Sequence, residues 1–294
     1  MNIIKKLIRA ILHVKQDETI RDAIDRHKTH ISKLFYKQKF NKEDFEHSIR
    51  KVGISANDTI MVLCAWRQFY NFQGNPDDII DILLSVVGIG GTIIMPSYGH
   101  NMEFLDIQNT PSKAGVLSET FRKRKGVQRS LCSHFTISAH GPNADVIIQQ
   151  NDKSRYGFDE YSPCSILTQM DTTKILFLGL GKIPAKVPLF HAAVYKYLTE
   201  KKETDRIINK KYVATIISEG ETKKKQMIAR DPYYANNNKA FRNVIKRTKS
   251  FQTTAISNLW ISSADCNDAF NNAMKFLQSG KSLYKHQNRK RYAL

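Results

Sequence analysis

The chain has 294 residues, 41% of them hydrophobic and 25% charged, a composition that suits a globular protein with a full hydrophobic core and excludes a disordered or collagen-like chain. No apolar run approaches the roughly 20 residues that a membrane-spanning helix needs. The 46 Lys and Arg against 27 Asp and Glu give a net charge of +19, which favours anionic partners: nucleic acid, anionic lipid or phosphate-bearing small molecules.

Part of this charge lies in short runs at 200–203, 223–225 and 289–291, which are typical of hairpin tips and a terminal tail. No zinc-finger, RNP or KH signature accompanies them, so we expect no nucleic-acid partner. The four cysteines are scattered without metal-ligand spacing, which predicts reduced thiols in a cytoplasmic protein and no metal site. They are Cys64, Cys132, Cys164 and Cys266.

The first 15 residues predict an amphipathic helix. Apolar residues between Ile3 and Leu12 recur at helical spacing, and Lys5, Lys6 and Arg9 fall on the other face. No small-residue cleavage site follows, so the segment does not resemble a signal peptide. Residues 1–15 either contact an anionic membrane surface or pack on the core or on another subunit, and we favour packing.

The next elements alternate between helix and strand. Helices are predicted over 19–36 and 42–52, the second capped by Asn41. A buried strand over 59–64, a helix over 76–87 capped by Asn75 and a strand over 92–95 that ends at Pro96 follow in order. This spacing predicts a right-handed βαβ unit with parallel strands.

The second half of the chain predicts another apolar strand over 174–181, an antiparallel hairpin of 211–217 with 225–230, and a helix over 264–278. We therefore expect an α/β fold with a mixed, largely parallel central sheet flanked by helices and a β-hairpin. The expected organisation is a helical N-terminal extension (1–40), an α/β domain (41–280) and a basic C-terminal tail (281–294).

One long ordered block carries a family resemblance. The chain reads TPSKAGVLSETFR over 110–122 and GVQRS over 126–130. This resembles the aminoglycoside 3-N-acetyltransferase family, whose pattern is a TPS, a glycine, an E-x-F-R and a following R-S. The resemblance covers roughly Phe40 to Leu277 and implies a divergent sugar N-acyltransferase with a coenzyme A thioester as co-substrate. Further matches are 91–96, Asp106, Gly141, Gly157-Phe158, Ser162-Pro163, Leu178-Gly179 and His191.

The resemblance implies where the cofactor binds. Acyl transfer from a thioester needs an unprotonated amine, donors for the oxyanion, and cations or helix N-termini for the coenzyme A phosphates. By similarity, the Pro111-Ser112 loop and the Arg129-Ser130 turn would hold the cofactor. Ser112 is placed to cap a helix over 115–124, and the basic residues of 122–125 with Arg129 would form an anion clamp. The alternative is a solvated helix end. The expected cofactor-binding residues are Pro111, Ser112, Gly115, Arg122, Arg129 and Ser130.

The chain also departs from the family pattern. The family's H-x-x-E becomes His191-Ala192-Ala193-Val194, its His-Ser-Ser becomes 63–65 (Leu-Cys-Ala), and its x-His-Pro becomes 131–133 (Leu-Cys-Ser). His191 is the first candidate for the general base and His134 the second. Cys132 is a weaker candidate for a nucleophile, because residues two apart on a strand point in parallel. We expect direct attack by the amine.

Charge guides the choice of acceptor. Aminoglycosides are polycations that call for carboxylates, whereas this chain is basic and lacks the glutamate beside His191. We therefore expect the acceptor to be an anionic small molecule. The favoured acceptor is a nucleotide-linked amino-deoxysugar that is used in the biosynthesis of a surface polysaccharide such as lipopolysaccharide. Its base or sugar would stack on aromatic side chains, although aromatics more often belong to a core. The expected aromatic residues are Trp66, Tyr70, Tyr156 and Tyr161.

Two other functions stay open: an aminoglycoside 3-N-acetyltransferase that confers resistance, and a non-catalytic ligand-binding protein of the same fold. We expect a cytoplasmic enzyme. In the alternative in which the first helix contacts lipid, the enzyme would be peripheral at the inner membrane surface. The acyl group, the sugar and the oligomeric state, including a homo-oligomer, are not fixed by the sequence.

Overall fold

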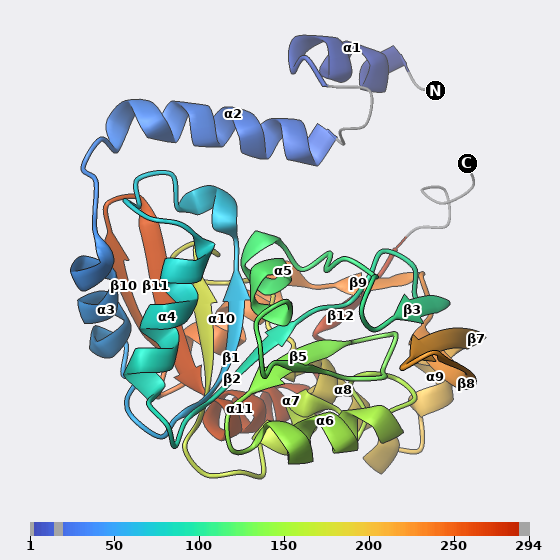
Figure 1. The fold of residues 1–294 in the computed structure, drawn as a ribbon. Helices are drawn as coiled ribbons and strands as arrows, with labels where there is room; N and C mark the ends of the chain where they lie inside the picture. Colours follow the sequence, from blue (N-terminus) through green and yellow to red (C-terminus); the bar gives the residue numbers. More distant parts are fainter. Residues whose placement is uncertain (1–2, 15–19, 288–294) are drawn as a thin grey trace.

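A seven-stranded mixed sheet forms the centre of the computed structural model, which describes residues 3–14 and 20–287 (Figure 1). Its strand order is β10-β11-β6-β1-β2-β5-β4. The strands are β1 (Thr59–Cys64), β2 (Thr92–Pro96), β4 (Gln128–Arg129), β5 (Ile137–His140), β6 (Thr173–Leu178), β10 (Gln252–Ile256) and β11 (Leu259–Asp265).

The expected mixed α/β architecture is confirmed, with one refinement of its sheet. Only the three central strands β6, β1 and β2 run parallel, with Thr59 opposite both Thr92 and Thr173. The outer pairs are antiparallel, because β10 and β11 form a hairpin and β5 runs opposite to β2. The parallel strands are the ones with continuous apolar runs, as strands covered on both faces require.

Helices cover both faces of the sheet. Buried Phe45, Ile79 and Phe121 belong to the cluster on one face, and buried Phe190 and Phe270 to the cluster on the other. On the first face lie α3 (Lys42–Lys51), α4 (Pro76–Val87) and α5 (Val116–Arg122). On the second lie α6 (Ala144–Lys153), α7 (Pro163–Leu167), α8 (Leu189–Glu200), α10 (Asn238–Lys246) and α11 (Cys266–Gln278).

The starts of α3 and α4 follow the predicted caps. Asn75 Oδ1 accepts hydrogen bonds from the backbone N–H groups of Asp77 and Asp78, at 2.8 and 3.2 Å. The Asp78 carboxylate accepts from the Asn75 N–H at 2.8 Å, which completes a capping box, and Asn41 forms the same motif in α3. These caps satisfy backbone donors that the first turn of a helix leaves free.

The predicted hairpin is also present, and it is longer than expected. β7 (Ile208–Ser218) and β8 (Glu221–Arg230) are antiparallel and turn at Glu219-Gly220. β3 (Phe104–Asp106) pairs parallel to β7 and completes a three-stranded sheet, and α9 (Thr204–Ile207) precedes β7.

The segment after α11 corrects one expected boundary. Residues 281–287, predicted as the start of a tail, fold back: β12 (Tyr284–His286) pairs antiparallel with β9 (Tyr234–Asn236). Leu283 is fully buried and Tyr284 is 4% exposed. The sequence analysis assigned both core residues to a tail because a basic run follows them. That run, residues 289–291, lies outside the described part of the chain.

The two N-terminal helices form an arm beside the domain (Figure 1). They are α1 (Ile3–Ile11) and α2 (Ile20–Phe35), and Tyr70, which follows the short 3-10 helix η1 (Trp66–Gln68), contacts Ser32 of α2 at 2.6 Å. Leu7, Ile11 and Phe35 are 61%, 67% and 80% exposed. Among the described side chains of α1, Leu7 and Ile11 are thus not packed on the core, which was one of the predicted alternatives. Within the described ranges, no helix has the length and apolarity to cross a bilayer.

The burial of Leu283 predicts that the C-terminal strand contributes to stability. Leu283→Ala should lower the free energy of unfolding by about 3 kcal/mol, since it removes buried methyl groups and leaves a cavity. Urea denaturation followed by circular dichroism measures this change. Lys285→Ala, on an exposed side chain of the same strand, is the control and should change stability by less than about 0.5 kcal/mol. Equal, negligible effects of both substitutions would mean that 281–287 is a tail after all.

Candidate active site

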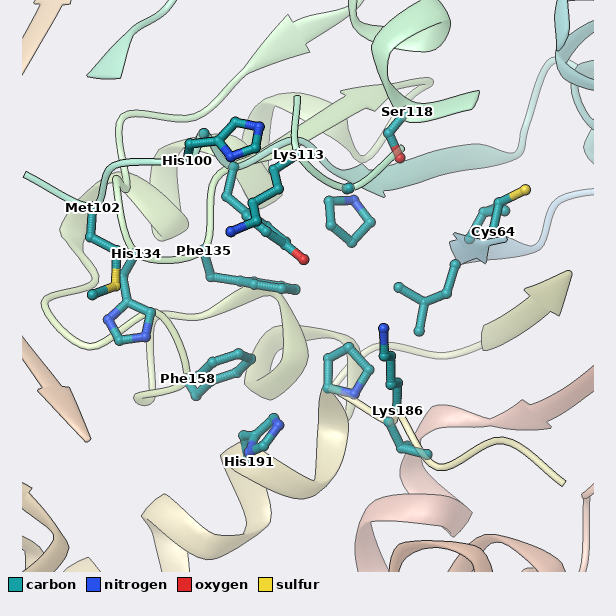
Figure 2. A pocket seen from close by; sticks show the side chains of 18 of the residues that line it. Cys64, His100, Met102, Lys113, Ser118, His134, Phe135, Phe158, Lys186 and His191 are labelled. Atoms are coloured by element: carbon teal, nitrogen blue, oxygen red, sulfur yellow. The ribbon is translucent and has the colours of Figure 1, made fainter. Parts of the chain in front are cut away.

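A cavity of about 580 Å³ opens where the three parallel strands end (Figure 2). Leu63 and Cys64 of β1, Pro96 of β2 and Leu180 just beyond β6 all line it. The carboxyl ends of parallel strands meet at one edge of a sheet, and such edges are the usual ligand sites of α/β folds. The cavity has the size of a small-molecule pocket.

Both histidines predicted for catalysis line this cavity. His191 lies in the first turn of α8, and His134 lies in the loop between β4 and β5. Figure 2 shows the Phe158 ring between them, with ring centroids 5.9 Å from His134 and 4.8 Å from His191. The fold thus joins residues that are 57 positions apart in the chain.

Gly157 allows this close approach. Its φ of +81° lies in the left-handed region, which favours glycine. A Cβ at this position would lie 2.9 Å from the Phe135 Cβ and 3.1 Å from the His134 Cβ. The family's glycine therefore has a structural reason here: the turn before Phe158 packs directly against the His134 loop.

Buried polar groups lie behind His191. Its Nδ1 is 2.6 Å from the Tyr284 hydroxyl. The Arg230 guanidinium lies 4.4 Å from the centre of the Tyr284 ring. Within the described part of the chain, Arg230 forms no ion pair, and its Nη1 donates to Asn236 at 2.7 Å.

Burial keeps both histidines neutral. Burial, together with the nearby positive charge of Arg230, lowers the pKa of His191 to about 3. It lowers the pKa of His134 to about 4, against a hydrogen bond to the Ile228 backbone that raises it. Both imidazoles are therefore neutral and able to accept a proton, but their low pKa values make them weak bases.

The thiols near the site are poor nucleophiles. Cys64 lines the cavity, but burial raises the pKa of its thiol. Cys132 is fully buried in a separate apolar cluster with Leu105 and Met227, and burial raises its pKa as well. Since the thiolate is the reactive form, neither thiol has the environment of an activated nucleophile. Among the described residues, no group of three His, Cys, Asp or Glu side chains could hold a metal ion.

The cavity is lined by cations without carboxylates. Lys113 and Lys186 line it, and Figure 2 shows both side chains directed inward. Neither forms an ion pair with any described carboxylate. Of the described residues that line the cavity, none is Asp or Glu. The site therefore suits a ligand with negative charge better than a polycation.

The residues predicted to bind the cofactor instead hold their own segment together. Glu119 accepts hydrogen bonds from the Ser112 N–H at 2.7 Å and from Arg122 Nε at 2.6 Å. Desolvation opposes the charge on Glu119, but these bonds lower its pKa to about 2. The prediction that Ser112 caps α5 is wrong: its Oγ accepts from the Ala114 N–H, and Gly115, with φ of +120°, occupies the N-cap without a side-chain bond.

Two arginines of the predicted anion clamp have partners within the protein. Arg129 donates to the carbonyls of Ile107 and Thr110, both at 2.8 Å, and desolvation lowers its pKa to about 10. Arg124 pairs with Asp77 and Asp81 of α4. Ser130 Oγ accepts from the Ile137 N–H and from Asn151, and Pro111 is exposed. The segment reaches the cavity through other residues, Lys113, Ala114 and Ser118.

The four predicted substrate-stacking aromatics do not line the cavity. Trp66 stacks on Phe69 at 4.8 Å, and Tyr70 contacts α2. Tyr156 is 3% exposed behind His134, and Tyr161 is 40% exposed elsewhere. The aromatics of the cavity are Tyr98, Phe135 and Phe158.

Sequence reasoning missed Tyr98, His100, Lys113, Lys186 and Asn236. Tyr98 and His100 follow directly after Pro96, at the carboxyl end of a strand that the sequence did predict. That position was the available signal, because loops at this edge of a parallel sheet build ligand sites. Asn236 and Lys186 carried no such signal.

Comparisons with known proteins agree with this fold. The sequence profile of the aminoglycoside 3-N-acetyltransferase family matches residues 61–278. Aminoglycoside N(3)-acetyltransferase IV of a Salmonella species is 27% identical over 147 residues, 48% of this chain. The match spans about half of that relative, 54% of its length.

Solved structures extend the likeness over most of the chain. AAC-IIIb in a binary complex with CoASH is 18% identical, with a TM-score of 0.68 over 83% of this chain and 98% of its own. AAC-VIa bound to sisomicin is 18% identical, with a TM-score of 0.67 over 83% of this chain and 100% of its own. These likenesses establish the fold, and the family profile covers well over half of the sequence. The resemblance seen in the TPS-to-RS block is thus confirmed: the chain belongs to the aminoglycoside 3-N-acetyltransferase family.

Proposed function

We propose that this chain transfers an acetyl or longer acyl group from a coenzyme A thioester to the amine of an amino sugar. The observation that carries the proposal is a cavity at the strand ends that holds two neutral histidines, in a member of an N-acetyltransferase family. His191 is the general base in this proposal, with His134 as the next candidate. A structural relative was crystallised with CoASH, which supports the choice of donor.

Aminoglycosides are the first acceptors to consider. The family takes its name from them, and relatives of the same fold were crystallised with sisomicin, a gentamicin and apramycin. In this form of the proposal the enzyme would modify an antibiotic. The proposal then has to account for binding a polycation in a cavity without a described carboxylate.

A second candidate acceptor follows from that lining. The unpaired ammonium groups of Lys113 and Lys186 favour an amino sugar that carries phosphate, such as a nucleotide-linked amino-deoxysugar used in surface polysaccharide synthesis. Such an enzyme would work in the cytoplasm, and a basic N-terminal arm would suit work at the inner membrane surface.

An acceptor panel tests the proposal. Thiol release from acetyl-CoA should be observed with at least one member of a panel that contains two aminoglycosides and nucleotide-linked 3-amino and 4-amino deoxysugars. Turnover with aminoglycosides alone would identify an antibiotic-modifying enzyme, and turnover with nucleotide sugars alone a biosynthetic one. No turnover, together with no calorimetric binding of coenzyme A, would favour the non-catalytic ligand-binding alternative.

The two lysines give a sharper prediction about the acceptor. With a phosphate-bearing acceptor, Lys113→Ala and Lys186→Ala should each raise the acceptor KM about tenfold, because each removes a charge-assisted contact of about 1.5 kcal/mol. Steady-state kinetics measure this, and Lys182→Ala, an exposed lysine near the Trp260 ring, is the control. An increase confined to the KM for acetyl-CoA would show that these cations serve the cofactor phosphates instead.

The lowered pKa values of the two histidines predict the pH dependence. Both imidazoles stay neutral as the pH falls, until it approaches about 4 for His134 and about 3 for His191. The acid limb of kcat/KM should therefore report the amine of the acceptor, which must lose its proton to attack. Among acceptors, this limb should move with the pKa of the amine. A limb fixed near pH 6.5 for every acceptor would mean that an ordinary histidine titrates instead.

A further inference from the structure

His191 has lost the partner that the family motif supplies on its own helix. The residue one turn later is Val194, which is 4% exposed and belongs to the apolar core. No carboxylate on α8 can therefore orient the imidazole. The hydrogen-bond partner of Nδ1 lies at the other end of the chain: it is the Tyr284 hydroxyl, at 2.6 Å.

Three contacts fix the position of that hydroxyl. Tyr284 pairs with Asn236 across the β12–β9 ladder, and its side chain is 4% exposed. Arg230 packs over the ring at 4.4 Å and donates to the Asn236 side chain at 2.7 Å. The His191 and Tyr284 rings lie 5.5 Å apart between centroids. The tyrosine is thus held through its ring, its hydroxyl and its backbone.

Either atom of the 2.6 Å contact between His191 Nδ1 and the Tyr284 hydroxyl can be the donor. With the imidazole proton on Nδ1, the Tyr284 oxygen accepts the Nδ1–H of His191. This arrangement leaves the lone pair of Nε2 free. No described residue makes a hydrogen bond to Nε2, and His191 lines the cavity.

We propose that Tyr284 is the positioning residue of the acyl transfer, which orients His191 through Nδ1 and so presents Nε2 as the proton acceptor for the attacking amine. This inference rests on the proposed function. In the step, the amine nitrogen forms a bond to the thioester carbonyl carbon, and the C–S bond breaks with its electron pair on the coenzyme A sulfur. The proton of the amine passes to Nε2 and from there to the departing thiolate, so the products are an amide and a thiol.

A hydroxyl does not replace a carboxylate in every respect. It orients the ring, but it adds no negative charge to stabilise an imidazolium beside Arg230. His191 would therefore pass the proton on during the reaction, and its imidazolium form would not accumulate.

Tyr284→Phe tests the inference, because it removes only the hydroxyl and keeps the ring under Arg230. We expect kcat to fall about 100-fold, the low end of what acid–base catalysis contributes, with the KM for acetyl-CoA unchanged. Nitrogen-15 NMR should show His191 protonated on Nδ1 in the wild type and shifted toward protonation on Nε2 in the variant. Tyr36→Phe, on an exposed tyrosine just after α2, is the control and should change neither.

Each result decides the inference. Protonation of Nε2 in the wild type would overturn it whether or not the variant folds, and so would an unchanged kcat and tautomer in Tyr284→Phe. A wild type that acylates no acceptor but whose His191 changes tautomer in the variant would refute the proposed function and keep the orienting role. A loss of kcat with an unchanged tautomer would make the role of Tyr284 merely structural and overturn the inference.

Discussion

The burial of His191 and His134 beside the Arg230 guanidinium is the constraint on which the site depends. Low polarity and a fixed positive charge both penalise an imidazolium, so both rings remain neutral acceptors. A carboxylate one turn from His191 would reverse this balance, and the chain has Val194 there, packed in the core. The loss of the motif's acid is therefore compatible with base chemistry, provided that another group orients the ring.

The elements that the sequence predicted best are those with strong local signals. The capped helix 76–87 and the apolar strand 59–64 have the predicted bounds, because Asn75 and the continuous apolar run act within a few residues. β4, β5 and β12 are short and lack such patterns. Their pairing depends on contacts far away in the chain, and for that reason local periodicity did not reveal them.

The site was predictable in part, for the same physical reason. His191 and His134 were found because histidine in a motif carries chemical meaning by itself. Arg122 and Arg129 were assigned to phosphate, but the sequence could not reveal that Glu119 and backbone carbonyls already bind them. The matched block is thus held together by its own hydrogen bonds.

The dependence on Tyr284 links catalysis to the completion of the fold. β12 comes after the last helix, so the partner of His191 is placed only when the end of the chain has paired with β9. Leu283, fully buried beside it, supplies the apolar contact that holds this strand. A chain that lost this pairing could keep its sheet and cavity walls and still lack an oriented base. In a site built from neutral groups, hydrogen bonds rather than an ion pair have to orient the base. The geometry of those hydrogen bonds depends on the packing of the residues that form them.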